Sequence, residues 1–152
     1  MSYPVIPPNQ SLNTKDYKHV VVVFGSRTFT NKKQFDDIMK RFVKRFKKEE
    51  LLFISGAASR GPDAMIIDWA YENGYPCKQV PADWLSSPKG AGFIRNREMA
   101  RLCTEGLGLW DRVSNGTRQM IDCLTALTKD CIVVNTDPEI GDICALRQKN
   151  ID

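Results

Sequence analysis

The chain has 152 residues, of which 42% are hydrophobic and 26% charged, a composition typical of one globular domain. No apolar run approaches the ~20 residues that cross a bilayer, so the sequence predicts no membrane-spanning segment. The formal net charge of +4 suits a polyanionic ligand such as a nucleotide, but it is too small to indicate nucleic-acid binding by itself.

The N-terminus and the cysteines are typical of a reducing compartment. Residues 1–8 lack a basic region followed by an apolar one, so we expect no secretory signal. The five cysteines are odd in number and no two have the C-x-x-C spacing, so we expect neither a disulfide framework nor a metal site. The single histidine, His19, precedes an apolar run and leaves no Ser–His or Cys–His pair to propose. We therefore expect a cytoplasmic protein without a metal or other cofactor.

The first third of the chain predicts an arm, a strand and a helix. Residues 1–17 contain three prolines, so we expect an extended N-terminal arm. The run 19–24, His-Val-Val-Val-Val-Phe, is rich in β-branched residues, which predicts a strand buried on both faces. Asn31 can cap a helix whose apolar residues recur at helical spacing. These residues are Phe35, Ile38, Met39, Phe42 and Phe46.

The outer face of this predicted helix is basic. Its charged residues are Lys33, Lys40, Arg41, Lys44, Arg45, Lys47 and Lys48. Such a face could contact nucleic acid, but the aromatic residues that would stack on exposed bases lie on the apolar face instead. We therefore expect a solvated helix surface, and the sequence disfavours nucleic acid as a partner.

The remaining elements continue to alternate between strand and helix. Strands are expected at 51–55, 77–80, 107–111 and 131–135. Helices are expected from Pro62 to near Gly74, from 93 to 104, and over the periodic run 120–127; Pro62 suits a first helical turn because an N–H there would lack a partner. Residues 137–152 are expected to form a polar C-terminal tail with at most one helical turn.

This alternation of β-branched strands and amphipathic helices predicts one α/β domain over residues 18–136. The expected architecture has three layers, α/β/α, around a mostly parallel five-stranded sheet. In such sheets, ligands bind beyond the carboxyl ends of the strands, near the point where the strand order reverses.

Polar turns that contain glycine or arginine follow four of the predicted strands, the third of them continuing into the loop before the third helix. Because the turns meet at one edge of the sheet, we expect them to form a single site for an anionic ligand. Glycine lets backbone approach the ligand, arginine can bond two phosphate oxygens, and the start of the fourth helix presents free N–H groups. The candidate ligand-binding residues are Gly25, Ser26, Arg27, Ser55, Gly56, Arg60, Gly61, Asp63, Arg95, Asn96, Ser114, Asn115, Gly116 and Thr117.

Three further residues have more than one interpretation. Trp84 can stack on a base or pack into the core, and Asp83 can bond a ribose or base edge or cap a helix. Asp111, at the end of the fourth strand, can bind a ribose hydroxyl, act as a general base or bond the following turn.

Five segments together resemble one protein family. They are Gly-Ser-Arg-Thr-Phe at 25–29, Arg-Gly-Pro-Asp at 60–63, Pro-Ala-Asp-Trp at 81–84, Gly-Phe-Ile-Arg-Asn-Arg-Glu-Met at 92–99 and Trp-Asp with Ser-Asn-Gly-Thr within 110–117. In this order and spacing they resemble the SLOG superfamily, specifically its YspA-like branch related to YpsA. The resemblance implies a Rossmann-like fold that binds a nucleotide or nucleotide-derived ligand, in a family common in bacteria and their phages.

The chain is more distantly similar to the LOG-type phosphoribohydrolases, which cleave the base from a nucleoside monophosphate. Arg95 matches their Arg-Lys-x-x-Met segment, but Asn96 replaces the lysine. Gly116 and Thr117 match their Gly-Thr-x-x-Glu turn, but Met120 replaces the glutamate. Because a thioether cannot transfer a proton, the similarity retains the phosphate site and leaves hydrolysis open.

Three functions remain open from the sequence. The first is a sensor, carrier or sequestering protein whose ligand phosphate contacts the start of the fourth helix, Arg27, Arg60 and Arg95. The second is an enzyme that breaks an N-glycosidic bond in a nucleotide, with Asp111 or Glu98 as the catalytic acid–base group. The third is a nucleic-acid-associated module that uses the basic helix face. We also expect self-association into a homo-oligomer, because small domains of this type often complete a pocket across a dimer interface.

Overall fold

Strands and helices alternate along the part of the chain that the structure describes. The computed structural model covers residues 12–136 and the backbone of residues 145–148. Its strands are β1 (His19–Gly25), β2 (Leu51–Ser55), β3 (Cys77–Gln79), β4 (Glu105–Trp110), β5 (Asp130–Asn135) and β6 (Ala145–Gln148). Its α-helices are α1 (Lys32–Val43), α2 (Pro62–Asn73), α3 (Ala91–Leu102) and α4 (Asn115–Ala126). None of these described helices is long and apolar enough to cross a membrane.

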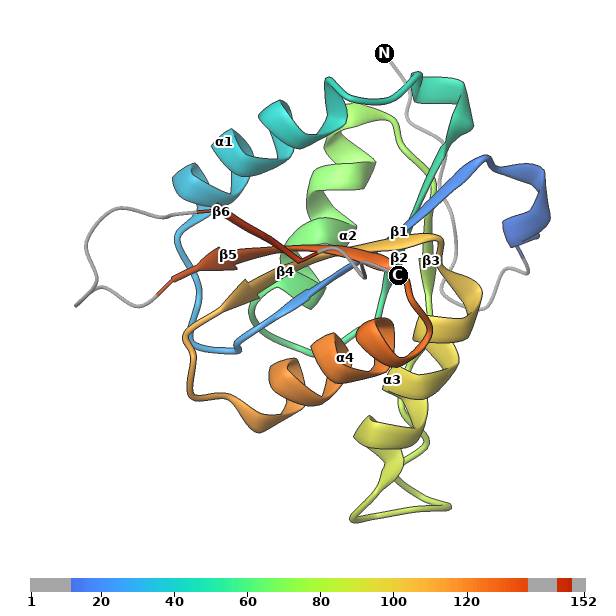
Figure 1. The fold of residues 1–152 in the computed structure, drawn as a ribbon, viewed down its shortest axis with the longest axis vertical. Coiled ribbons are helices and arrows are strands. Elements are labelled where there is room, and N and C mark those ends of the chain that lie inside the picture. The colour runs from blue at the N-terminus through green and yellow to red at the C-terminus, as the bar shows by residue number, and fades with distance from the viewer. Residues whose placement is uncertain (1–11, 137–144, 149–152) are drawn as a thin grey trace.

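The strands form one sheet in the order β3-β2-β1-β4-β5-β6 (Figure 1). Strands β1 to β5 pair in parallel, and β6 pairs antiparallel with β5. The predicted mostly parallel sheet is confirmed, but it has six strands within the described residues instead of five. The sixth strand lies inside the expected C-terminal tail. The rest of that tail, and residues 1–11 of the expected arm, lie outside the described residues.

Two hydrophobic cores lie on opposite faces of this sheet. Alternate residues of β1 point to opposite faces, so Val21 and Val23 pack in the core beneath α1 and α2. Val22 and Phe24 pack in the core beneath α3 and α4. Each of these β1 side chains is 4% exposed or less, and burying one stabilises the fold by roughly 1.5–3 kcal/mol. The predicted burial of β1 on both faces and the α/β/α layering are therefore confirmed.

The helix ends follow local sequence signals, with one difference. The Asn31 side chain accepts a hydrogen bond from the backbone N–H three residues on, at 3.0 Å, and so caps α1 as expected. Pro62 begins α2, and Gly74, with a φ of 76°, ends it. Helix α1 ends before Phe46, although the apolar pattern continues to that residue. Phe46 instead packs against Phe42 from the turn after the helix, with ring centroids 5.2 Å apart.

Candidate functional site

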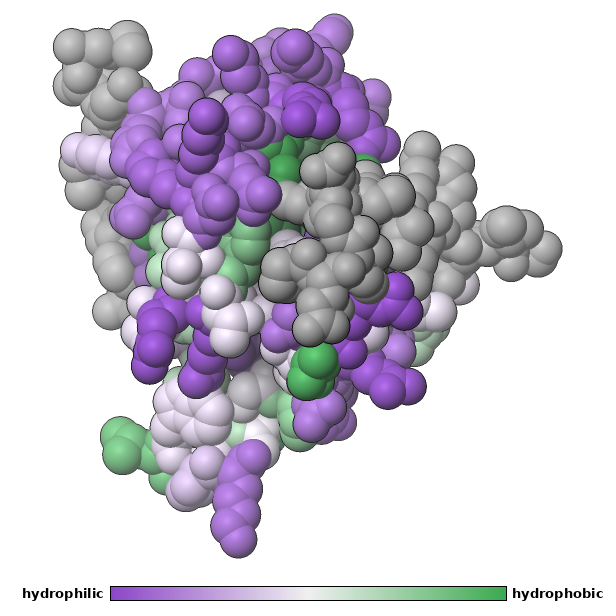
Figure 2. All heavy atoms as spheres, turned by 90° about the vertical axis from the view of Figure 1, so that its left-hand side faces the viewer, coloured by the Kyte–Doolittle hydropathy of each residue, from purple (hydrophilic) through white to green (hydrophobic). Residues whose placement is uncertain are grey.

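A cavity opens at the carboxyl edge of the sheet, where the strand order reverses between β1 and β4. This is the position at which open α/β sheets bind ligands. Figure 2 faces this edge of the molecule. The cavity, here called the edge cavity, has a volume of about 300 Å³. The residues that line it are Phe24, Gly25, Ser26, Arg27, Thr28, Ala58, Asp63, Arg95, Asn96, Ser114, Gly116, Thr117 and Met120.

The start of α4 forms one wall of the edge cavity. Ser114 is the N-cap residue, but its side chain makes no capping hydrogen bond, because its hydroxyl donates to Asp111 Oδ2 at 3.0 Å. Gly116 and Thr117, in the first turn of α4, line the cavity. The first N–H groups of a helix have no partner inside the helix, and they carry the positive end of its dipole. The wall is therefore suited to an anionic group such as a phosphate.

Asp111 holds the loop that leads into this helix. Its Oδ1 accepts hydrogen bonds from the N–H groups of Val113 and Ser114, both at 2.8 Å, and its Oδ2 also accepts from the Thr28 hydroxyl at 3.3 Å. Partial burial acts to raise the pKa of Asp111, but hydrogen bonds from the backbone N–H groups of Ser114 and Val113 and from the side chains of Ser114 and Ser26 lower it to about 2. Of the three roles open from the sequence, the structure describes the bond to the following turn. A catalytic role for this weakly basic carboxylate stays a prediction.

Ser26 and Gly25 join the turn after β1 to the end of β4. Ser26 is 1% exposed; its N–H donates to the carbonyl oxygen of Leu109 at 2.9 Å, and its hydroxyl accepts from the N–H of Asp111 at 3.0 Å. A Cβ on Gly25 would collide with the Leu109 carbonyl oxygen and lie 2.6 Å from Cγ of Pro62. Glycine is therefore required where β1, β4 and the start of α2 meet.

Two arginines bring positive charge to the edge cavity. Arg95, on α3, donates from Nη1 to the carbonyl oxygen of Gly56 and from Nε to Oδ1 of Asn96 at 3.0 Å. These bonds fix the planar guanidinium at the cavity wall, which reduces the entropy lost when it binds an anion. Arg27, in the turn after β1, lines the same cavity and is exposed. The edge cavity thus combines one fixed cation, one adaptable cation and a helix N-terminus.

Asp63 is the carboxylic acid among the residues that line the edge cavity. It is 7% exposed and lies in the first turn of α2. Burial raises its pKa to about 6, although Arg95, Arg27 and backbone hydrogen bonds from Ala58 and Gly25 all act to lower that pKa. Its protonation state therefore changes close to neutral pH, which is common for groups at functional sites.

Residues around β2 shape the environment of Asp63. The Ser55 hydroxyl donates to the backbone carbonyl of Asp63 at 2.6 Å and accepts from the N–H of Ala57 at 3.0 Å. A Cβ on Gly56 would lie 2.8 Å from both Asp63 Oδ2 and Arg95 Nη1, so the small residue leaves room for the two charged groups. Ser55 therefore holds the backbone that carries Asp63, and Gly56 leaves space for the side chains of Asp63 and Arg95.

Asn96 connects the two helices that flank the cavity. Its Nδ2 donates to Oε1 of Gln119 at 2.8 Å and to the carbonyl oxygen of Gly116 at 3.3 Å, both on α4. The asparagine that replaces the lysine of the phosphoribohydrolase pattern thus bridges α3 to α4. Met120, which replaces their glutamate, lines the cavity and is 1% exposed.

The structure does not bring every predicted site residue to this cavity. Arg60 and Gly61 line a neighbouring cavity between α1 and α2. Asp83 is exposed and accepts from the N–H of Ser86 at 3.1 Å, so it caps a turn. Trp84 is 50% exposed, so it does not pack into the core. Two other candidates, Asn115 and Glu98, are exposed on their helices and are absent from the cavity lining.

Some lining residues were not predicted from the sequence. Phe24 and Met120 belong to a buried core that reaches the cavity floor, and no local pattern marks them as site residues. Thr28 and Ala58 come from the first and second turns, so their place after a strand was an available signal. The burial of Asp63 beside Arg95 could not be predicted from the sequence, because Arg95 lies on another helix.

Comparisons with known proteins agree with the fold, and the family match covers the part of the chain that holds the first three of the five motif segments. Residues 19–86 match the family model YAcAr, described as the YspA, cpYpsA-related SLOG family. Among solved structures, the chain is similar to DNA processing protein A from Helicobacter pylori, described for its single-stranded DNA binding mode. That similarity has a TM-score of 0.55 and 18% sequence identity, over 84% of this chain and 73% of the other, and it shows a shared fold. A comparison with curated proteins gives no match.

Proposed function

We propose, from the match of residues 19–86 to the YspA, cpYpsA-related SLOG family, that the edge cavity binds a nucleotide or a nucleotide-derived phosphorylated ligand. The phosphate contacts the first turn of α4 and the guanidinium groups of Arg27 and Arg95. The protein then acts as a sensor, carrier or sequestering protein for that ligand.

One observation carries this proposal: the N-terminus of α4 has no side-chain cap and opens into a cavity lined by two arginines. Each cation can make charge-assisted hydrogen bonds to phosphate, which are roughly twice as strong as neutral ones. A neutral ligand would leave the helix dipole without an anionic partner, and the two arginines with the Asp63 carboxyl group as their shared counter-charge. The arrangement therefore favours a phosphorylated ligand over an uncharged nucleoside.

A nucleotide panel tests the proposal. Mononucleotides, cyclic nucleotides and NAD-derived species are titrated into the protein and followed by calorimetry and thermal shift, with the matching nucleosides as controls. We expect at least one phosphorylated species to bind and to raise the melting temperature, while its nucleoside does not. If no phosphorylated species binds, the proposal is wrong. Mass spectrometry of any ligand that co-purifies then identifies the base and the number of phosphates.

An N-glycosidic-bond hydrolase is a second candidate, and the carboxyl group of Asp63 favours it. A carboxyl with a pKa of about 6 in the ligand cavity can exchange a proton with water or with a leaving base near neutral pH. Chromatography of the incubated panel for free base tests this activity. Loss of base release in Asp63→Asn, but not in Asp111→Asn or Glu98→Gln, would assign the acid–base role to Asp63. Absence of any released base would exclude the enzyme and leave the binding function intact.

Nucleic acid is a further candidate partner. DNA processing protein A, which has a similar fold, is described for binding single-stranded DNA, so the expectation that nucleic acid is an unlikely partner is not supported. The lysines and arginines of the basic helix face are all exposed on α1 and the turn after it. Hydrophilic side chains cover this upper part of the molecule in Figure 2. The face therefore offers a surface for a phosphate backbone, separate from the edge cavity.

A further inference from the structure

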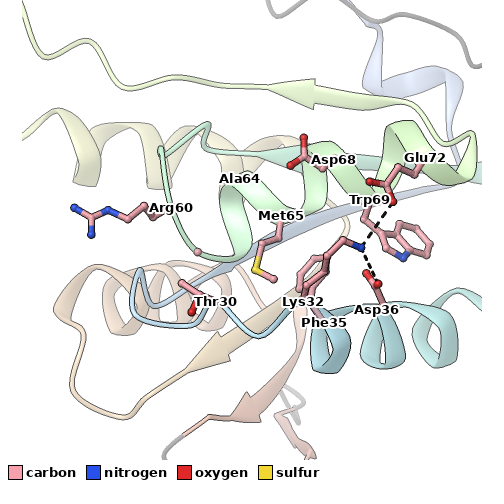
Figure 3. Close-up of a pocket in the computed structure, with 11 residues that line it drawn as sticks. Thr30, Lys32, Phe35, Asp36, Arg60, Ala64, Met65, Asp68, Trp69 and Glu72 are labelled. Atoms are coloured by element: carbon pink, nitrogen blue, oxygen red, sulfur yellow. Dashed lines mark hydrogen bonds and ion pairs between the residues drawn. The ribbon is translucent and has the colours of Figure 1, made fainter.

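A second cavity of about 300 Å³ lies between α1 and α2, here called the helix cavity (Figure 3). Apolar side chains form much of its wall, including Phe35, Ala64, Met65 and Trp69. The polar residues that complete its lining are Thr30, Lys32, Asp36, Arg60, Asp68 and Glu72. A flat, mainly apolar group with a few hydrogen-bonding atoms suits this lining.

A ridge of two touching loops, the turn after β1 and the loop before α2, lies between the helix cavity and the edge cavity. Gly61 lines the helix cavity, whereas Ser26 and Arg27 line the edge cavity. Gly61 has a φ of 78°, and a Cβ there would lie 2.8 Å from the carbonyl oxygen of Ser26 and 2.9 Å from Cα of Arg27. The backbones of the two loops are therefore in direct contact. The two cavities are neighbours across this contact.

The carboxylates of the helix cavity differ in their partners. In Figure 3, Lys32 reaches between two of them, with Nζ 2.9 Å from Oδ2 of Asp36 and 3.9 Å from Oε2 of Glu72. Asp68 is exposed, and among the described residues its carboxylate makes no direct hydrogen bond or ion pair, although Lys32 interacts with it electrostatically over a longer distance. Of the three carboxylates, it is therefore the one whose oxygens are not in direct contact with Lys32 and can accept a hydrogen bond from a ligand in the cavity.

We propose that the base of the bound nucleotide occupies the helix cavity, across the ridge from its phosphate, and that Asp68 selects bases that carry an amino group. This inference rests on the proposed function. The base packs against Met65, whose thioether makes favourable contacts with aromatic rings, and against Phe35 and Trp69. An exocyclic amino group donates to Asp68, whereas a carbonyl at the same position would face a carboxylate that cannot donate. Arg60, which also lines the helix cavity, belongs to the ridge loop.

Calorimetric titration of AMP, IMP, CMP, UMP and ribose 5-phosphate tests this inference. The wild-type protein is expected to bind AMP and CMP roughly ten-fold more tightly than IMP and UMP. Asp68→Asn, an exposed substitution that retains the fold, is expected to remove this preference. The matched control Asp37→Asn removes an exposed carboxylate of α1 that lines neither cavity and is expected to preserve it.

Filling the helix cavity gives an independent test. Ala64→Phe is expected to weaken AMP binding to the level of ribose 5-phosphate, without changing the affinity for ribose 5-phosphate itself. Circular dichroism confirms that this variant is folded before it is titrated. Unchanged AMP binding in both Ala64→Phe and Asp68→Asn, with loss in Arg95→Ala, would overturn this inference and retain the proposed function. Loss of AMP binding in Trp84→Ala alone would place the base against the indole instead. No binding of any probe to the wild-type protein would refute both proposals.

Discussion

The guanidinium group of Arg95 donates a hydrogen bond to the carbonyl oxygen of Gly56, which joins α3 to the loop after β2. The carboxyl group of Asp63 reaches the same place, because a Cβ on Gly56 would lie 2.8 Å from its Oδ2. A cation and a buried acid from two helices thus meet at the edge cavity. Burial raises the pKa of the acid to about 6 although the cation acts to lower it, so the charge of the cavity depends on pH.

Asp63 is expected to make the stability of the fold depend on pH. Its pKa is raised from 3.8 to about 6, so the folded state holds its proton more tightly than the unfolded state. The stabilisation is fully present below pH 3.8 and is lost as the pH rises through about 6, amounting to roughly 3 kcal/mol. Urea denaturation at several pH values measures the free energy of unfolding. Between pH 4 and 6 this free energy should fall more steeply with pH for the wild-type protein than for Asp63→Asn. Equal slopes for the two proteins would contradict this prediction.

Asp111 is expected to stabilise the fold at neutral pH and to lose this effect in acid, the opposite pH dependence to that of Asp63. Its pKa is lowered to about 2, so its ionised form stabilises the folded state above pH 3.8, and this contribution is lost as the pH falls toward 2. Asp111→Asn should therefore reduce the free energy of unfolding at pH 7, with a difference from wild type that shrinks below pH 4. If the difference in free energy of unfolding between the two proteins stays constant from pH 7 to below pH 4, the charge of Asp111 does not cause the stabilisation.

Substitution of Gly25 is expected to destabilise the fold. Gly25→Ala places a methyl group against the Leu109 carbonyl oxygen and Pro62, and should lower the free energy of unfolding by roughly 3 kcal/mol or more. Gly116→Ala is the matched control, because a Cβ at Gly116 meets no atom within 4 Å, and its change should stay within about 1 kcal/mol. Chemical denaturation of both variants checks the prediction, which fails if the two changes are similar.

The basic face of α1 is expected to make any nucleic-acid binding depend on salt. Replacing Lys44, Lys47 and Lys48 by alanine should weaken binding of a single-stranded oligonucleotide. It should also reduce the slope of log K against log salt by about 0.7 for each phosphate that a lysine no longer neutralises. Fluorescence anisotropy at several salt concentrations measures both quantities. The control variant neutralises three exposed lysines elsewhere, Lys15, Lys18 and Lys89. An equally weakened control would indicate a general charge effect and no interface on α1.

Much of the fold could be predicted because its signals are local. The valine run of β1 and the Asn31 cap of α1 depend on neighbouring residues, and the structure confirms both. Strand β6 could not be predicted, because an antiparallel edge strand is defined by its pairing with β5 and not by its own apolar pattern. The end of α1 before Phe46 could not be predicted either, since an apolar side chain in the following turn can pack on the same core.

The position of the candidate site could be predicted from the sequence, but the placement of Arg60 and the pKa of Asp63 could not. Ser26, Arg95 and Thr117 follow from the rule that turns meet at the carboxyl edge, and they line one cavity. Arg60 could not be placed, because the direction of its loop depends on the left-handed Gly61 and on contact with the turn after β1. The pKa of Asp63 depends on burial and on arginines distant in sequence, which no local motif reveals.

The most direct test of the central claim is a calorimetric titration of the tightest-binding nucleotide into the wild-type protein, Arg95→Ala and Arg97→Ala. Arg95 lines the edge cavity, whereas Arg97 is exposed on the same helix and does not line it. We predict that Arg95→Ala weakens binding by at least roughly ten-fold, since hydrogen bonds to charged groups contribute about 1.5–3 kcal/mol, while Arg97→Ala binds like wild type. Equal affinities for all three proteins would contradict a phosphate site in the edge cavity.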